Sequence, residues 1–506
     1  MKPRYIVSII WIIIALLAIV CWCMPQGGVH IGKYTLHWPT LTEVLEPDNS
    51  QELDTTWIAE SEDFNILDIT DGDTLSVPVR EVRPLEPKFR LIDSVIDSVT
   101  DSVVILPVDT TATKVDTLVE SKVIVFPPSD KPQSTNSDTR NYLAAFYQAL
   151  DSAEVMPIRV IHYGDSQIEE DRITDILRER WQGEYGGGGV GLIPLHQTIP
   201  TRGIRQWITI NGIKQSAKGG PKRYLIYGSR SMRQEGNDYG MMGQVAIMDS
   251  LLVSGSQQVT LYVESIGKKH KPHKYFNRIQ LFAEDIKCNI MTAGTTIEPT
   301  TNHRLFYLPD STTKCQIQLQ GKGKVYGISL ETSTGVMVDN IPMRGCSGTI
   351  FTRLNSSSLS NYFYQTNTRL IIMQYGGNMI PQSKTTSAIN NYVNNLRQQV
   401  RRIRACAPYA SILFIGPSDM STRLDGKMAT YPMVPYLDKQ LKKMAAEEHI
   451  AYWSIYDAMG GQGSMITWVE KDLAGKDYVH FTRAGANKVG NMLVNWIDNG
   501  KKIEQP

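Results

Sequence analysis

The chain has 506 residues, of which 42% are hydrophobic and 20% are charged, and its formal net charge is +1. This composition is typical of a globular protein with room for more than one domain, and it excludes a disordered chain, a collagen and a small disulfide-rich protein. The near-neutral balance also excludes a strongly basic nucleic-acid-binding protein. The charge is unevenly distributed, because residues 41–140 hold 21 Asp and Glu against 8 Lys and Arg.

The first predicted element is a membrane-spanning helix within residues 1–27. Residues 6–24 contain one strongly polar side chain, that of Ser8, and a helix of this length crosses about one hydrocarbon core. Because Lys2 and Arg4 precede the segment, the positive-inside rule predicts a cytoplasmic N-terminus and an exported body. A cleaved signal peptide is the alternative, although no good A-x-A cleavage site follows the apolar run.

Residues 28–140 form a predicted acidic stalk of low complexity. The tripeptide Asp-Ser-Val recurs at residues 93, 97 and 101, and this four-residue repeat fits neither a strand nor a sustained heptad. The excess of negative charge favours an extended, self-repelling spacer. A small β-rich domain is the alternative, because Val and Ile favour strands.

From residue 141 onward, helical and strand-like segments alternate. A helix is expected over 141–154, a buried strand over 158–163 and a second helix over 168–181, which together predict a unit of an α/β sheet. The glycine run that follows at 185–191 lacks the Lys-Ser/Thr ending of a phosphate-binding loop. We interpret it as a flexible loop.

Between residues 203 and 328 the pattern changes to short strand-like runs separated by polar or Gly-containing turns. This pattern predicts an all-β sandwich inserted into the α/β domain, whose helix and strand pattern resumes afterwards. The predicted domains are the anchor (1–27), the stalk (28–140), the first part of the α/β domain (141–202), the inserted sandwich (203–328) and the second part of the α/β domain (329–506).

The spacing of cysteine and histidine predicts no metal site. Cys288 and Cys315 could pair in an exported domain, but buried free thiols fit the sequence equally well. His270 and His273 have a ligand-like spacing, but lysines surround them, so we interpret their segment as a solvated loop. His162, on the first buried strand, is interpreted as a satisfied core histidine.

Four short motifs lie in loops of the predicted α/β sheet. Ser166 ends the motif Gly-Asp-Ser at a helix start, where a serine can attack an acyl carbon while a backbone N–H holds the oxyanion. Asp477 lies three residues before His480, so its carboxylate can orient the imidazole as a general base. Asn378 can donate its amide to an oxyanion, and Gly345 lets a backbone N–H approach a ligand. Each motif alone is common in caps and turns, but sites of open α/β sheets form at the carboxyl ends of the strands.

In chain order, these residues resemble the sequence blocks of the SGNH (GDSL-type) hydrolase superfamily. The resemblance implies a flavodoxin-like three-layer α/β/α domain, no metal and no cofactor. It also implies Ser166 as the nucleophile, His480 as the base and Asp477 as the residue that orients it. The implied oxyanion hole consists of the Ser166 N–H, the Gly345 N–H and the Asn378 side chain. The nucleophile motif reads GDSQ instead of GDSL, and the absence of G-x-S-x-G argues against the α/β-hydrolase fold.

A narrower resemblance, to periplasmic peptidoglycan O-acetylesterases, rests on VIHYGDSQ, YGGGGVGLIPL and YGISLETSTGVMVDNIPMRGCSG, with a β insertion before the last of them. In that group the insertion is a carbohydrate-binding-like sandwich. The resemblance implies a serine esterase that removes O-acetyl or another short acyl group from a cell-wall or exported polysaccharide. With the predicted anchor, it implies a single-pass protein of the bacterial inner membrane whose catalytic domain lies in the periplasm. Candidate sugar-stacking residues, for each of which ordinary packing is the alternative, are Tyr224, Tyr227, Tyr239 and Tyr275.

Three alternatives stay open, one of which is a lipase or thioesterase, although no long apolar lid is evident in the sequence. A polysaccharide O-acyltransferase would form the same acyl-enzyme and pass the group to a sugar hydroxyl. A non-catalytic polysaccharide-binding or assembly protein would use the sandwich alone, but the presence of Ser166, Asp477 and His480 argues against it. The expected partners are acylated polysaccharide or peptidoglycan and the membrane, without nucleic acid, and a membrane acyltransferase is a candidate protein partner.

Overall fold

The computed structural model describes residues 29–31, 34–36 and 139–504, except for 198, 200, 216–219, 235, 249–257, 267–270 and 299–303. The predicted anchor (1–27) and all but a few residues of the predicted stalk (28–140) lie outside the described residues. Within the described residues, no helix is both long enough and apolar enough to cross a membrane. The chain divides into two units, 1–59 and 60–506, and the first contains an antiparallel pair of strands, β1 (Val29–Ile31) and β2 (Tyr34–Leu36).

The second unit is built around a five-stranded parallel sheet in the order β16-β3-β17-β18-β21. These strands are nearly continuous runs of buried residues, which is typical of a sheet covered on both faces. Counted along the chain, the order is 2-1-3-4-5, as in flavodoxin-like sheets. The strands are β3 (Pro157–Gly164), β16 (Gly335–Pro342), β17 (Thr368–Gln374), β18 (Ser411–Ile415) and β21 (Ala451–Trp453).

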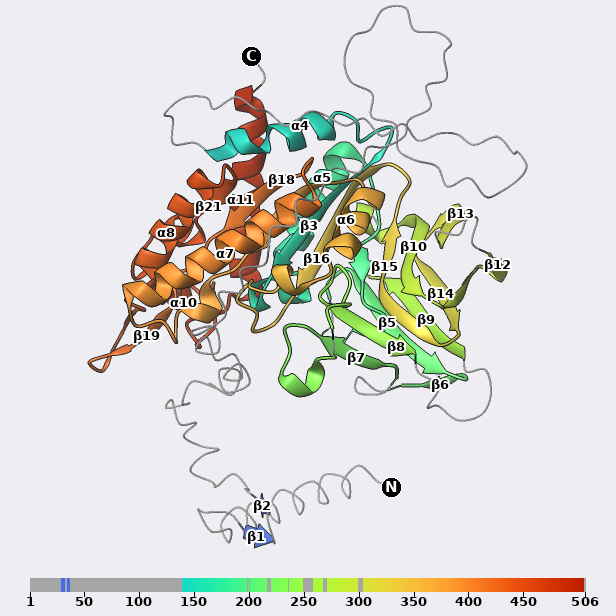
Figure 1. The fold of residues 1–506 in the computed structure, drawn as a ribbon, viewed down its shortest axis with the longest axis horizontal. Helices are drawn as coiled ribbons and strands as arrows, with labels where there is room; N and C mark the ends of the chain where they lie inside the picture. The colour runs from blue at the N-terminus through green and yellow to red at the C-terminus, as the bar shows by residue number, and fades with distance from the viewer. Residues whose placement is uncertain are drawn as a thin grey trace, which may run out of the picture. The chain divides into compact units, whose positions relative to one another are not determined.

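Helices cover both faces of this sheet, which confirms the predicted α/β fold (Figure 1). On one face α6, α7 and α8 pack around Ile371 and Met373 of β17, and on the other α4, α5 and α11 pack around Leu370 and Ile372. The helices are α4 (Ala144–Leu150), α5 (Thr174–Tyr185), α6 (Ser356–Gln365), α7 (Thr386–Cys406), α8 (Val434–Glu447), α9 (Ile455–Met459), α10 (Ser464–Glu470) and α11 (Arg483–Glu504).

Helix α7 shows how the sequence specifies such an element. The hydroxyl of Thr385 caps its start by accepting a hydrogen bond from the Ala388 amide at 3.2 Å. An apolar stripe then faces the sheet, because residues at three- and four-residue spacing lie on one side of a helix. The buried members of this stripe are Ile389, Val393, Leu396, Val400 and Ile403.

Two antiparallel sheets follow α5 in the chain. One has the order β13-β10-β15-β8-β7, with β4 also paired to β15, and the other has the order β12-β11-β14-β9-β5-β6. Several of their strands alternate buried with more exposed residues, as in Cys315, Ile317 and Leu319 of β14, and the buried residues form a core of their own. The predicted limits of the insertion, 203 and 328, stay predictions, since β4 precedes them and β15 extends past them.

The strands of the first antiparallel sheet are β4 (Gly191–Ile193), β7 (Lys222–Leu225), β8 (Gln244–Met248), β10 (Phe276–Glu284), β13 (Leu305–Thr312) and β15 (Gly323–Glu331). Those of the second are β5 (Ile204–Ile210), β6 (Ile213–Lys214), β9 (Gln258–Ser265), β11 (Lys287–Thr292), β12 (Thr295–Ile297) and β14 (Lys314–Gln320). A short pair, β19 (Ser421–Leu424) and β20 (Lys427–Thr430), follows β18.

The glycine run packs closely against the end of β15, so its interpretation as a flexible loop is wrong. Gly187 and Gly189 have φ angles of 112° and 73°. A Cβ atom on Gly189 would lie 2.0 Å from the carbonyl oxygen of Leu330, at the end of β15. The backbone therefore passes β15 at a distance that only glycine permits.

The prediction for His162 agrees with the structure, whereas that for His273 does not. His162 is fully buried within 3.0 Å of Gln374, as a core histidine should be. His273 is also buried, at 3% exposure, so its placement in a solvated loop is wrong, and burial lowers its pKa to about 4. His270 lies outside the described residues. Cys288 and Cys315 are buried free thiols, and burial raises the pKa of each to about 12.

A buried ion cluster joins the parallel sheet to the antiparallel strands. Arg159 of β3 donates to both carboxylate oxygens of Asp339 on β16, at 2.7 and 2.9 Å, and pairs with Glu331 at the end of β15. Arg278 of β10 also pairs with Glu331, at 2.8 Å, and the Tyr362 hydroxyl donates to Asp339 at 2.7 Å. The cluster therefore connects β3, β10, β15, β16 and α6.

Removing the central cation should destabilise the fold strongly. Arg159→Met leaves two buried carboxylates without their shared partner, so we expect the free energy of unfolding to fall by about 3–5 kcal/mol. Arg205→Met, which removes an exposed pair with Glu264, is the control and should cost less than about 1 kcal/mol. Urea denaturation measures both. Equal losses in the two variants would contradict a structural role for the cluster.

Candidate active site

The five residues predicted as a site all lie at the carboxyl edge of the parallel sheet or in the loop before α11. Ser166 follows β3 and begins the short 3-10 helix η3 (Ser166–Asp171), and Asn378 lies in η7 (Gly377–Met379), directly after β17. The strand order reverses beside β3, because β16 lies on one side of it and β17 on the other. Such a switch point is where ligands bind in open α/β sheets.

A continuous chain of hydrogen bonds links Ser166, His480 and Asp477. The Ser166 Oγ lies 2.8 Å from Nε2 of His480, and Nδ1 of His480 lies 2.7 Å from Oδ2 of Asp477. The His480 side chain is 30% exposed, so the chain is open to solvent at this point. The arrangement is that of a nucleophile, a base and the carboxylate that orients the base.

The loop that carries Asp477 holds itself in shape. The Oδ1 atom of Asp477 accepts hydrogen bonds from the amides of Val479 and His480, at 3.0 and 3.1 Å. The Gly475 amide donates to the His480 carbonyl at 2.8 Å. Burial alone would raise the pKa of Asp477, but the hydrogen bonds from the His480 ring and from these amides outweigh it and lower the pKa. Asp477 is therefore ionised at neutral pH and can stabilise an imidazolium at His480.

Asn378 and Gly345 occupy the two loops expected for an oxyanion hole. The Asn378 amide nitrogen donates to Oδ2 of Asp165 and to the Cys346 carbonyl, both at 3.1 Å. An oxyanion would therefore compete with one of these two acceptors for an amide hydrogen. Gly345 has a φ angle of 71° and no atom within 4 Å of the place a Cβ would take.

A side-chain clamp that the sequence analysis missed joins the Gly345 loop to the Ser166 loop. Arg344 donates through Nε and Nη2 to the two carboxylate oxygens of Glu169, at 2.8 and 2.6 Å. Glu169 is 3% exposed and lies at a kink in η3, three residues after Ser166. The only sequence signal was the arginine before Gly345, because the partner lies 175 residues away.

Asp165 is a second positioning residue that the sequence analysis did not single out. Its Oδ1 accepts a hydrogen bond from the Gln167 amide at 2.9 Å, and its Oδ2 accepts one from Asn378. Burial raises its pKa to about 6. One carboxylate thus holds both the turn after Ser166 and the amide of Asn378.

The four candidate sugar-stacking tyrosines are all buried or partly buried. Tyr239 is 1% exposed and its hydroxyl donates to the Gln234 carbonyl, so ordinary packing accounts for it. Tyr224 and Tyr227 are partly buried against the core under α6, α7 and α8. Tyr275, before β10, is also partly buried.

Residues 310–488 match the model of the GDSL-like lipase/acylhydrolase family. The match begins within β13 and so includes Gly345, Asn378, Asp477 and His480, but not Ser166. In the described residues no group of three or more His, Cys, Asp or Glu could hold a metal ion.

Among solved structures, the chain is similar to a peptidoglycan O-acetylesterase, with 20% identity over 73% of this chain and 99% of that chain and a TM-score of 0.56. It is less similar to the periplasmic domain of a lipopolysaccharide acetyltransferase from Salmonella ser. Paratyphi A (14% identity, 32% of this chain and 73% of that chain, TM-score 0.24). A family 3 carbohydrate esterase from Clostridium thermocellum is 12% identical over 33% of this chain and 71% of that chain, with a TM-score of 0.24. No curated protein matches the chain.

Loosening the clamp should slow the chemistry more than it weakens binding. Glu169→Gln loses the bidentate ion pair that holds the Gly345 loop, so we expect kcat for p-nitrophenyl acetate to fall about tenfold with KM little changed. Glu170→Gln, which changes an exposed neighbour, is the control. A wild-type kcat in Glu169→Gln would rule out this positioning role.

The raised pKa of Asp165 makes the stability of the fold depend on pH. Because its pKa is higher in the folded than in the unfolded chain, Asp165 should destabilise the fold progressively as pH rises from about 4 to about 6. The stability of Asp165→Asn relative to wild type should therefore increase by about 2 kcal/mol between pH 4 and pH 7. Urea denaturation at both pH values measures this difference. If the stability difference between Asp165→Asn and wild type does not change with pH, the pKa of Asp165 is not raised in the folded chain.

Proposed function

We propose that this chain, a carboxylic ester hydrolase with a GDSL-type acylhydrolase domain, is a serine esterase that removes O-acetyl or another short acyl group from a polysaccharide. The observation that carries the proposal is the hydrogen-bond chain from Ser166 through His480 to Asp477. The fold supports the same proposal, because it resembles that of a peptidoglycan O-acetylesterase.

The geometry supports a two-step acyl transfer. In the first step the Ser166 Oγ attacks the acyl carbon and its proton passes to Nε2 of His480, which then protonates the leaving sugar oxygen. In the second step His480 takes a proton from water, the hydroxide attacks the acyl-Ser166 ester, and the carboxylic acid leaves as Ser166 regains its proton. Asp477 keeps the imidazole oriented and stabilises its charged form in both steps.

The developing oxyanion requires donors beside Ser166. The backbone N–H groups of Ser166 and Gly345 and the side-chain amide of Asn378 are the proposed donors. Asp165 and the Arg344–Glu169 pair keep these loops in register. Donors fixed in advance stabilise the transition state without reorganisation during the reaction.

We propose that the protein works on the outer side of the bacterial inner membrane. Residues 6–24 are apolar apart from Ser8 and follow Lys2 and Arg4, a pattern that supports a single-pass anchor with the enzyme domain in the periplasm. Acylated peptidoglycan or an exported polysaccharide is the substrate available there.

Replacing the nucleophile tests the proposal. In Ser166→Ala we expect acetate release from O-acetylated peptidoglycan, and from p-nitrophenyl acetate, to fall by about 10⁴-fold or more. Ser357→Ala, an exposed serine of α6, is the matched control and should keep wild-type rates. The rates are measured with the full-length chain.

Two outcomes would contradict the proposal in different ways. Activity of Ser166→Ala within tenfold of wild type would exclude Ser166 as the nucleophile. Loss of the acetyl group from the donor only when a sugar acceptor is present, with the group transferred to that acceptor and no acetate released, would identify an acyltransferase instead of a hydrolase.

A further inference from the structure

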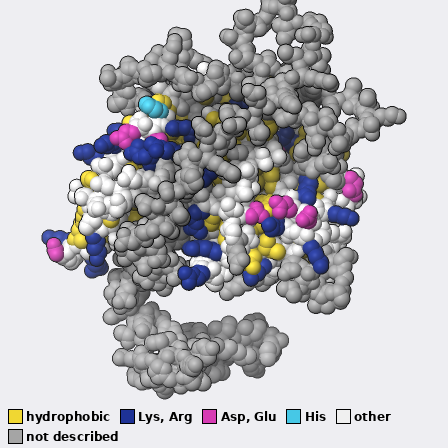
Figure 2. Space-filling model, viewed as in Figure 1, with side chains coloured by type: hydrophobic (Ala, Val, Ile, Leu, Met, Phe, Trp, Pro, Cys, Tyr) yellow, Lys and Arg dark blue, Asp and Glu magenta, His cyan; other side chains and the backbone are white. Residues whose placement is uncertain are grey.

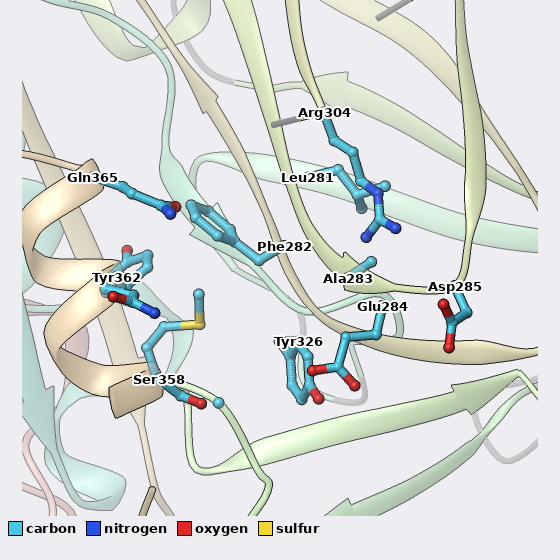
Figure 3. A pocket seen from close by; sticks show the side chains of 13 residues that line it. Leu281, Phe282, Ala283, Glu284, Asp285, Arg304, Tyr326, Ser358, Tyr362 and Gln365 are labelled. Atoms are coloured by element: carbon cyan, nitrogen blue, oxygen red, sulfur yellow. The ribbon is translucent and has the colours of Figure 1, made fainter. Parts of the chain in front are cut away.

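A cavity of about 580 Å³ lies between the antiparallel strands and α6, and its volume is within the range of about 300–1,000 Å³ that is usual for small-molecule sites. The ends of β10 and β15 form one wall and the outer side of α6 forms the other (Figure 3). None of its residues belongs to the hydrogen-bond chain of Ser166. Those that matter here are Phe282, Glu284, Arg304, Tyr326, Asn361 and Gln365.

The polar side chains of this cavity combine donors with acceptors. Arg304 can only donate and the carboxylate of Glu284 can only accept, whereas the amides of Asn361 and Gln365 do both. Within the part of the chain that the structure describes, the side chains of Arg304, Asn361 and Gln365 make no hydrogen bond. Figure 3 shows Gln365 and Arg304 on opposite walls. Their polar groups are therefore available to a ligand.

Two aromatic rings add a rigid apolar surface. Phe282 packs edge-on against Tyr362 of α6, with ring centroids 5.0 Å apart and planes at 71°. Tyr326 is held in place because its hydroxyl donates to Asp238 at 2.7 Å. Both residues are partly buried and both line the cavity.

The charge balance disfavours a strongly charged ligand. Glu284 and Asp285 line the same cavity as Arg304, so its walls carry both negative and positive charge. Neither an anion nor a cation is therefore favoured as the ligand. Figure 2 shows acidic and basic side chains intermixed, with hydrophobic atoms between them, on the visible face over the antiparallel strands. A ligand that both donates and accepts hydrogen bonds, and that carries apolar C–H surfaces, matches these walls better.

We propose that the cavity is a second glycan-binding site, which takes a short neutral oligosaccharide of hexose or N-acetylhexosamine units. Sugar hydroxyl and acetamido groups both donate and accept, as Asn361 and Gln365 do. The C–H faces of the sugar rings would pack on Phe282 and Tyr326. Such a site would hold the polymer away from the ester bond that Ser166 is proposed to attack. The identity of this polymer with the acylated substrate rests on the proposed function.

The test compares two pairs of substitutions in the full-length chain. Asn361→Ala with Gln365→Ala removes two exposed amides, four residues apart, from the cavity side of α6. Asn394→Ala with Gln398→Ala removes the same residue types, with the same spacing and exposure, from α7 outside the cavity. Calorimetric titration with chitotetraose and with cellotetraose measures binding. Hydrolysis of p-nitrophenyl acetate reports separately on the candidate active site.

We expect at least one tetrasaccharide to bind to the unaltered chain and to the α7 variant with the same Kd. The α6 variant should bind it about tenfold more weakly, because hydrogen bonds to the sugar are lost. All three proteins should hydrolyse p-nitrophenyl acetate at one rate. Tighter binding of chitotetraose would identify an N-acetylhexosamine site, and tighter binding of cellotetraose a hexose site.

Absence of binding by both sugars, or equal binding by the α6 and α7 variants, would overturn the inference. These readouts do not depend on esterase activity. A chain that binds sugar but hydrolyses no ester would contradict the proposed function and leave the second site standing.

Discussion

The buried cluster of Arg159, Glu331 and Asp339 is the interaction on which the arrangement of the second unit depends. Arg159 lies on β3, the strand that ends beside Ser166, and its two partners lie on β15 and β16. Desolvated charges are tolerated only in one well-matched geometry, so the cluster sets the position of β3 against β15 and β16. The loop after β16 carries Arg344 and Gly345, and its register with the Ser166 loop follows from that of the two strands.

The parallel sheet and the site residues were predictable because their signals are local. Apolar runs predict buried strands, and the predicted site residues lie in loops at the ends of such runs. The family match over residues 310–488 confirms the resemblance to SGNH hydrolases that these motifs indicated. The roles of Ser166, Asp477, His480, Gly345 and Asn378 stay predictions, although the first three lie within hydrogen-bonding distance in the order required.

The features that the sequence did not predict depend on contacts between distant segments. Glu169 and Arg344 gave no joint signal, and the glycine run resembled a flexible loop because nothing local shows that it must pass the end of β15. His273 was misplaced for the same reason, since lysines surround it in the sequence while its buried position is created by α5. The two walls of the cavity beside α6 come from segments that lie far apart in the sequence, so no local pattern predicts the cavity.

The most direct test of the central claim is to trap the acyl-enzyme. The full-length chain is mixed with O-acetylated peptidoglycan, quenched with acid during turnover, digested and analysed by mass spectrometry. Our account predicts an acetyl group on the peptide that contains Ser166, and none on that peptide in Ser166→Ala. Acetate release with the acetyl group on a different residue, or undiminished release from Ser166→Ala, would contradict it.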